Sequence, residues 1–257
     1  MSIRAMIIVV VSGMAAGLLP SIAAGTITPS GTSIPAVVQA TYYSSTGDAM
    51  PAATSNTVAV NVDYPTEVSI GTAKTLEDGT FIQLKPAVVI AGTAELGEVF
   101  YVESSDRSAG IRVATMQTIE EGSMVVVAGT VGTLNGERQI NAVDVKSIST
   151  GNTLPKPVGL IQRFLGQPPD TSGLLIKIWG RAYSGPTGSN WFYVDDGSGA
   201  RDSLGNLGTR VIGSLPSDYI GKLVTVTGIC SVEPSDSENL RVIRMRRISD
   251  VALLTNQ

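Results

Sequence analysis

The chain has 257 residues, of which 18 are Lys or Arg, 22 are Asp or Glu and none is His, so its formal net charge is −4. Without histidine, Ser-His-Asp and Cys-His nucleophilic machinery and imidazole-ligated metal sites are excluded. The 28 glycines and 13 prolines, with only 16% charged residues, favour short strands and turns over long helices, which is typical of an all-β protein.

Residues 1–25 have the pattern of a secretory signal. A short basic start is followed by the apolar run 6–19 and then by small residues at 20–24. The apolar run is shorter than the roughly 20 residues that a membrane-spanning helix needs. We expect cleavage near Ala23 to Gly25 and a secreted or extracellular surface protein with no transmembrane span in the mature chain. A retained apolar leader, as in membrane anchors or pilin-like subunits, is the alternative.

Residues 26–71 predict a β-hairpin, because they hold two β runs, 36–43 and 55–62, joined by a polar turn segment. An isolated hairpin is marginal in water, so its apolar side needs cover from either of two later domains of the chain or from another chain. The residues expected to make this assembly contact are Val37, Val38, Tyr42, Tyr43, Val58, Val60 and Val62.

The rest of the chain contains an internal repeat. The tetrapeptide FYVE at 100–103 recurs as FYVD at 192–195, and GSMVVVAG at 122–129 recurs as GKLVTVTG at 221–228. A polar turn and another β run follow in both places. The repeat therefore predicts two copies of one domain.

Each copy is expected to hold five strands, which avoid exposed edges by closing into a barrel. Gly129 and Gly228 lie inside long strands, as expected at the sharp bend of a barrel corner. The predicted fold is all-β: two consecutive five-stranded barrels, 72–149 and 173–257, with an N-terminal β-hairpin extension. The expected strands are 81–90, 99–103, 110–114, 123–134 and 138–148 in the first copy, and 174–183, 190–195, 209–212, 223–231 and 240–248 in the second.

The motif order in these copies, a strand, a turn, FYVDDGSG and GKLVTVTG, resembles the oligonucleotide/oligosaccharide-binding (OB) fold of secreted bacterial proteins. The resemblance implies that Phe and Val of the FYV motif point inward and that Asp-Gly-Ser-Gly forms the turn to the third strand. The first copy departs from it, with Glu-Ser-Ser-Asp at 103–106 in place of the Asp-Gly turn. The hairpin resembles the last hairpin of immunoglobulin-like repeats on bacterial surface proteins.

Between the copies, residues 150–172 contain four prolines and predict a semi-rigid linker. Asp195 and Asp196, with Asp202 nearby, are interpreted as turn residues, with a cation site and acid/base chemistry as alternatives. Cys230 is interpreted as a small buried apolar residue. No catalytic residue, metal site or cofactor is predicted, and the chain is not expected to be an enzyme.

The first strand of the second copy predicts a ligand platform, because successive side chains of a strand point to opposite faces. Aromatic rings beside cations on an OB barrel suit single-stranded nucleic acid, with the rings stacking on bases and the charges following phosphates. Residues 173–257 hold 9 basic and 8 acidic side chains and residues 73–150 hold 6 and 10, so the first barrel is too acidic to extend a phosphate track. The platform residues are Lys177, Trp179, Arg181 and Tyr183 on this strand and Trp191 and Tyr193 on the next predicted strand.

A cluster of four arginines, Arg241, Arg244, Arg246 and Arg247, lies on or beside the predicted last strand. Such charges serve solubility, an acidic protein partner or nucleic acid. The acidic first barrel of a neighbouring copy is one such partner, and an unclosed head-to-tail contact generates a filament.

The leading hypothesis is thus a secreted, non-catalytic structural subunit that self-assembles into an extracellular filament or surface polymer through its hairpin. The alternative is an extracellular OB-fold binding module for single-stranded nucleic acid or oligosaccharide. An adaptor domain of a larger secreted enzyme system is a third interpretation.

Overall fold

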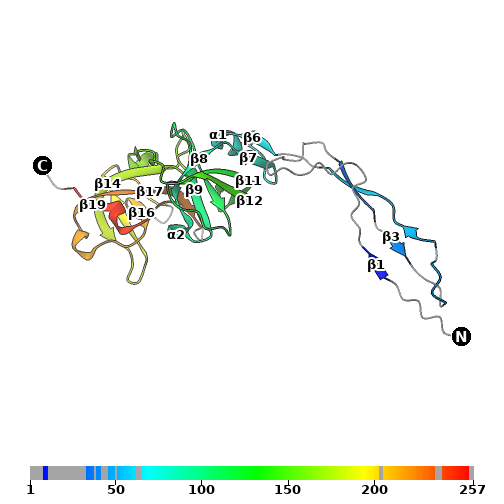
Figure 1. Cartoon of the computed structure of the whole chain (residues 1–257). Helices are drawn as coiled ribbons and strands as arrows, with labels where there is room; N and C mark the ends of the chain where they lie inside the picture. Colours follow the sequence, from blue (N-terminus) through cyan, green and yellow to red (C-terminus); the bar gives the residue numbers. More distant parts are fainter. Residues whose placement is uncertain are drawn as a thin grey trace. The chain divides into compact units, whose positions relative to one another are not determined.

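The computed structural model describes residues 8–10, 33–37, 39–41, 46–49, 51–61, 65–202, 205–234 and 239–254 (Figure 1). The chain divides into two compact units, Met1–Tyr64 and Pro65–Gln257. The first unit contains the predicted hairpin, and the second contains both predicted barrels.

The first unit is built from short paired strands. β2 (Ser33–Ala36) runs antiparallel to β5 (Val58–Asn61), and β3 (Gln39–Thr41) runs antiparallel to β4 (Ala53–Thr54). These pairs form the predicted ribbon, with each arm split into two strands. A further strand, β1 (Ile8–Val10), pairs antiparallel with β3 and lies within the apolar run that was predicted to be a secretory signal.

Part of the predicted assembly surface lies on this ribbon. Val58 is 57% exposed and Val37 is 36% exposed. Val60 also lies within β5. The other predicted assembly residues of the hairpin, Val38, Tyr42, Tyr43 and Val62, lie outside the described residues.

The first barrel follows the predicted strand order closely. The expected first strand is broken into two at Pro86, which lacks the N–H that a continuous ladder needs. β11 pairs with β7, β8 and β12, and β10 runs parallel to β12, which closes the barrel. The strands are β7 (Phe81–Leu84), β8 (Ala87–Ala91), β9 (Val99–Glu103), β10 (Gly110–Ala114), β11 (Met124–Leu134) and β12 (Glu137–Ser149).

Three short elements surround this barrel. β6 (Thr66–Val68) runs parallel to β7, and α1 (Ile70–Ala73) follows it with Ser69 as its N-cap. α2 (Thr93–Leu96) joins β8 to β9. Both α-helices of the described residues have four residues, and none of the helices there is long and apolar enough to cross a membrane.

The second barrel repeats the same strand order and again pairs its third and fifth strands in parallel. Its last strand ends at Arg244, not at Ile248 as predicted, because the chain turns through η3 (Ile248–Asp250) into β19 (Val251–Leu253), which pairs with β17. Two consecutive closed five-stranded barrels confirm the predicted all-β fold. The strands are β14 (Leu175–Ser184), β15 (Trp191–Asp195), β16 (Thr209–Ile212), β17 (Leu223–Glu233) and β18 (Leu240–Arg244).

The barrel interiors are filled by alternate residues of each strand. Phe100 and Phe192 of the two FYV motifs lie inside their barrels and are at most 1% exposed. A Cβ atom added to Gly129 would lie 2.3 Å from the carbonyl oxygen of Asn141, and the register between β11 and β12 shifts at this point. The glycine is therefore required where the strand bends, as predicted from the sequence.

The segment 150–172, predicted to be a semi-rigid linker, packs on the second barrel over part of its length. Its short strand β13 (Val158–Gly159) pairs in parallel with β14, and η1 (Gln162–Phe164) follows. Leu160 and Leu165 pack against the apolar core of the second barrel. Burial of these apolar side chains outweighs the tendency of a Pro-rich segment to stand free.

The two barrels contact each other directly. Tyr101 of the first barrel packs with Leu175 and Ile229 of the second, and its hydroxyl lies 2.8 Å from the hydroxyl of Ser231. Ser231 also donates a hydrogen bond of 2.9 Å to Glu137. Hydrogen-bonded polar groups inside an apolar contact hold the two barrels together as one unit.

The predicted arginine cluster is largely used within the chain. Arg246 pairs with Glu121 of the first barrel at 3.0 Å and with Asp250 at 2.7 Å, and Arg247 pairs with Glu121 at 2.5 Å. Arg244 pairs with Glu233 at 3.0 Å. The acidic partner expected on a neighbouring copy is thus present in the same chain, so these arginines give no argument for a filament.

Candidate ligand-binding face of the second barrel

β14 presents four of the six predicted platform residues to solvent. Trp179 is 41% exposed and Tyr183 is 44% exposed, while Lys177 and Arg181 are also exposed. The intervening residues, Ile176, Ile178, Gly180 and Ala182, are buried in the barrel. The alternation read from the sequence therefore places these four side chains on one outer face.

The two exposed rings are widely separated on this face. Four residues along a strand correspond to about 13 Å, so Trp179 and Tyr183 together suit an extended ligand rather than a single ring. Gly159 of β13 lies beside the indole, since a Cβ atom there would be 3.8 Å from the Trp179 ring. The indole is thus supported at its edge and exposed above the strand.

The other two platform residues are covered by an arginine. Trp191 and Tyr193 meet edge to face, with ring centroids 5.4 Å apart and an interplanar angle of 82°. The guanidinium of Arg210 lies 4.2 Å from the Trp191 centroid and 5.7 Å from the Tyr193 centroid. This cation–π contact covers the rings, so they are not the free stacking surface that the sequence predicted.

Hydrogen bonds hold this cluster rigid. The Tyr193 hydroxyl donates to the Asp202 carboxylate and accepts from Asn206 at 2.9 Å and from Arg210 at 3.1 Å. The pKa of Tyr193 is raised above its ordinary value, chiefly by burial and also by the hydrogen bond to Asp202. Asp202 therefore orients the Tyr193–Arg210 pair.

Asp195 and Asp196 make the turn that was predicted from the sequence. Their carboxylates accept hydrogen bonds of 2.9 Å from the backbone N–H groups of Gly197 and Ser198. Asp196 also accepts a 2.9 Å bond from the backbone of Gln162, which ties η1 to the barrel. Burial opposes ionisation of Asp196, but these hydrogen bonds outweigh it and lower its pKa.

Two further residue classes bear on chemistry. Cys230 is fully buried, and burial raises the pKa of its thiol to about 11, so it packs as an apolar residue. Over the described part of the chain, no group of three or more Cys, Asp or Glu side chains is placed to hold a metal ion.

The first barrel carries a matching Tyr–Arg pair. Arg112 lies opposite Tyr101 in the β9–β10 ladder, just as Arg210 lies opposite Tyr193 in the β15–β16 ladder. Tyr101, however, is 1% exposed because the second barrel packs over it. The first barrel therefore does not offer the equivalent open face.

Arg210 is the main site residue that the sequence analysis did not identify. The signal was present, because the predicted third strand of each copy contains an Arg-Val pair, at 112–113 and at 210–211. A search of known protein-family models and of curated proteins found no match to this chain.

Proposed function

We propose that the second barrel is an oligosaccharide-binding module whose ligand lies along β14. The observation that carries the proposal is the pair of exposed rings, Trp179 and Tyr183, on one face of one strand. Sugar rings present apolar C–H faces that pack on aromatic rings, and OB-like barrels bind oligosaccharides on an outer face of the barrel. Arg181, which lies between the two rings along the strand, and Lys177, which lies beside Trp179, donate hydrogen bonds to sugar hydroxyls.

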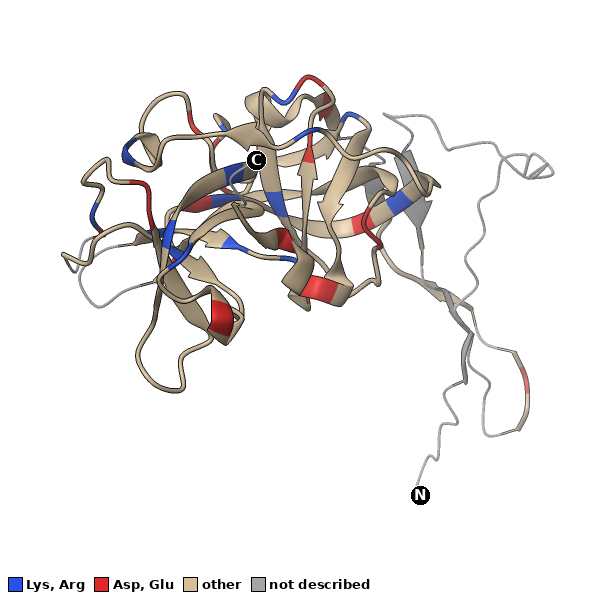
Figure 2. Ribbon diagram, turned by 90° about the vertical axis from the view of Figure 1, so that its left-hand side faces the viewer, with Lys and Arg blue, Asp and Glu red and all other residues tan. Residues whose placement is uncertain are grey.

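The charge distribution favours a saccharide over a nucleic acid. A phosphate backbone requires a continuous track of Lys and Arg. In Figure 2 blue basic and red acidic segments alternate over the barrels. Arg241, Arg244 and Arg246 each lie within ion-pair distance of a carboxylate of the same chain. Stacking on sugar rings needs no such track.

Calorimetric titration tests this proposal with hexasaccharides of β-1,4-glucose, N-acetylglucosamine and galacturonate, and with the oligonucleotide dT12. We expect at least one saccharide to bind, and Trp179→Ala to weaken it about tenfold, in line with the cost of removing one stacking ring. Phe81→Ala, which removes an exposed ring from the first barrel, is the matched control and leaves the affinity unchanged.

Three results would overturn the proposal: no saccharide binding, equal effects of the two alanine variants, or binding of dT12 alone. In the last case the affinity would fall steeply with salt, and the nucleic-acid interpretation would replace the saccharide one.

A second function, self-association through the ribbon, is supported by a separate observation. Val58 is 57% exposed on β5, and within the described part of the ribbon β2 and β5 pair only with each other. Such a two-stranded ribbon leaves backbone donors and acceptors open for another strand. We propose that a second copy of the ribbon covers this edge and the Val58 face.

Sedimentation of the full chain tests the association. Val58→Asp places a charge on the apolar face, and we expect it to shift the protein from oligomer to monomer. Ala59→Asp adds the same charge on the opposite face of β5 and is expected to leave association intact. A wild-type chain that stays monomeric at high concentration, or two variants that behave alike, would refute this function.

A further inference from the structure

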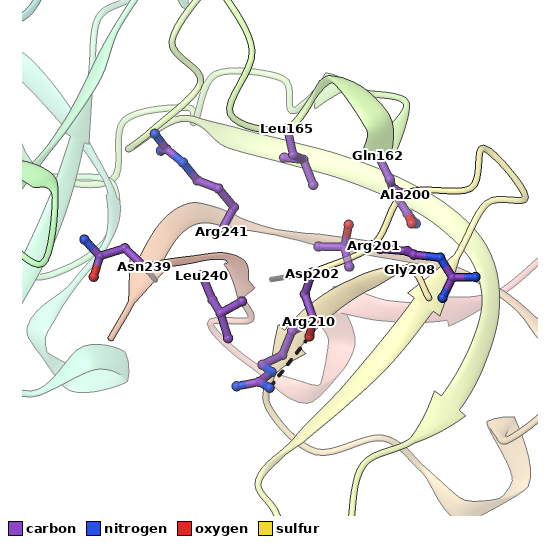
Figure 3. A pocket seen from close by; sticks show the side chains of 11 residues that line it. Gln162, Leu165, Ala200, Arg201, Asp202, Gly208, Arg210, Asn239, Leu240 and Arg241 are labelled. Atoms are coloured by element: carbon purple, nitrogen blue, oxygen red, sulfur yellow. Dashed lines mark ion pairs between the residues drawn. The ribbon is translucent and has the colours of Figure 1, made fainter. Parts of the chain in front are cut away.

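A small cavity lies beside the Arg210 cluster. Its walls come from η1, from residues 200–202 and 208 and from β16 and β18, and its volume is about 180 Å³. Figure 3 shows Gln162 projecting from η1 on one side and Arg210 reaching toward Asp202 on the other. The volume exceeds what one water molecule needs.

Two polar atoms of the cavity walls are buried without a hydrogen-bond partner. Gln162 is 2% exposed; its amide nitrogen donates to the Trp179 carbonyl at 3.3 Å, but its Oε1 accepts no hydrogen bond. Arg210 Nε likewise donates to no acceptor. Unpaired buried polar groups are rare because they lose their hydration without replacement. Both residues line the cavity, so a polar ligand there has one unpaired acceptor and one unpaired donor in the walls around it.

The charges around the cavity are unbalanced. Arg201, Arg210 and Arg241 line it, while Asp202 is the only carboxylate among the described residues of the lining. Arg241 shares Asp170 with Lys74, which lies closer to that carboxylate, at 2.7 Å against 3.8 Å. These residues together hold two more cations than carboxylates, which suits a ligand with a single negative group and not a phosphate track.

The cavity lies two strands across the sheet from the proposed sugar-binding face. Tyr183 on β14 lies opposite Tyr193 on β15, which lies opposite Arg210 on β16. Neighbouring strands are about 4.8 Å apart, so Tyr183 and Arg210 are separated by roughly 10 Å across the sheet. A chain of two or three sugar units spans this distance.

We propose that the cavity receives a uronic-acid residue of an acidic oligosaccharide, whose neighbouring units stack on Tyr183 and Trp179. The sugar carboxylate accepts hydrogen bonds from Arg201 and from Arg210 Nε, and a ring hydroxyl donates to Gln162 Oε1. Planar guanidinium groups match a carboxylate in two-point geometry. The inference rests on the proposed saccharide binding and adds the charge class of the saccharide.

The test compares hexagalacturonate with its fully methyl-esterified form by calorimetry. We expect the wild-type chain to bind the acid at least tenfold more tightly than the ester. Arg201→Gln, at an exposed side chain, is expected to reduce this preference to threefold or less and to leave ester binding unchanged. Arg163→Gln, on η1 but outside the cavity lining, is the matched control and keeps the full preference.

Gln162→Leu provides a second variant, with its thermal midpoint measured to confirm folding, and is expected to weaken the acid at least threefold. Equal binding of acid and ester, or an unchanged preference in Arg201→Gln, would overturn the cavity assignment while leaving saccharide binding intact. Absence of binding by both ligands, with the other hexasaccharides also inactive, would overturn the proposed function itself.

Discussion

Gly110→Val is expected to lower the free energy of unfolding by about 3 kcal/mol, the upper end of the cost of overpacking a close contact. A Cβ atom on Gly110 would lie 2.1 Å from the carbonyl oxygen of Gly173, so the backbones of the two barrels touch at this point. Gly173 also has a φ of +82°, a conformation that other residues rarely adopt. Neither backbone has room to move without breaking the contact between the barrels.

Denaturant unfolding of Gly110→Val measures this effect. Gly71→Ala is the control. A Cβ atom at Gly71 of α1 would meet other atoms only at 4.0 Å, and the φ of Gly71 lies outside the left-handed region that favours glycine. This substitution is expected to be neutral or to stabilise the protein by up to about 1 kcal/mol. If Gly110→Val unfolds at the wild-type denaturant concentration, the direct contact between the barrels is wrong.

The stability of the protein is expected to fall as the pH rises from about 4.5 to 7, because of Glu103. This side chain is fully buried; one carboxylate oxygen accepts a 2.8 Å hydrogen bond from the Leu175 backbone and the other has no partner. Burial raises the pKa of Glu103 to about 7, against the opposing Leu175 hydrogen bond and the Arg107 charge. The folded chain thus holds a proton that the unfolded chain has released.

The sign follows from proton linkage. Above pH 4.5 the unfolded state binds fewer protons at Glu103 than the folded state, so the free energy of unfolding decreases with pH until Glu103 ionises in the fold. The contribution amounts to about 3 kcal/mol between pH 4.5 and 8. Glu103→Gln removes it, so the variant is expected to match the wild type near pH 4 and to exceed its stability above pH 7.

Urea unfolding of both proteins between pH 4 and 8 checks this expectation. Glu137, whose pKa is also raised by burial, adds a slope of the same sign that both proteins share. Below pH 4 the trend reverses, because the pKa of Asp170 is lowered to about 2 by its bonds to Lys74 and Ser172, which outweigh its burial. Parallel profiles for the two proteins above pH 4.5 would show that Glu103 is not buried as described.

Local signals predicted the barrels well. The bounds of β9, β10 and β16 match the expected strands exactly, because each is a short apolar alternation between clear turn residues. The break at Pro86 was missed, although its cause is local. The packing of 150–172 and the Arg246–Glu121 pair were also missed, since both depend on contacts between segments far apart in the sequence.

Some features of the candidate site were likewise predicted from local sequence signals, and others were not. The exposure of Trp179 and Tyr183 follows from strand alternation and was predicted. The cover over Trp191 was not predicted. Trp191 pairs with Ile212 on the neighbouring strand, and it is Arg210, two residues before Ile212, that covers the indole through a cation–π contact. The unpaired oxygen of Gln162 depends on how η1 seats against the barrel, which composition does not encode.

A backbone amide chemical-shift map of the full chain during titration with hexagalacturonate tests the proposed binding site on the second barrel most directly. We expect shifts along β14 around Trp179 and Tyr183 and around the Arg201 cavity, with the first barrel unaffected. Shifts confined to β9 and β10 of the first barrel, or none at millimolar ligand, would contradict it.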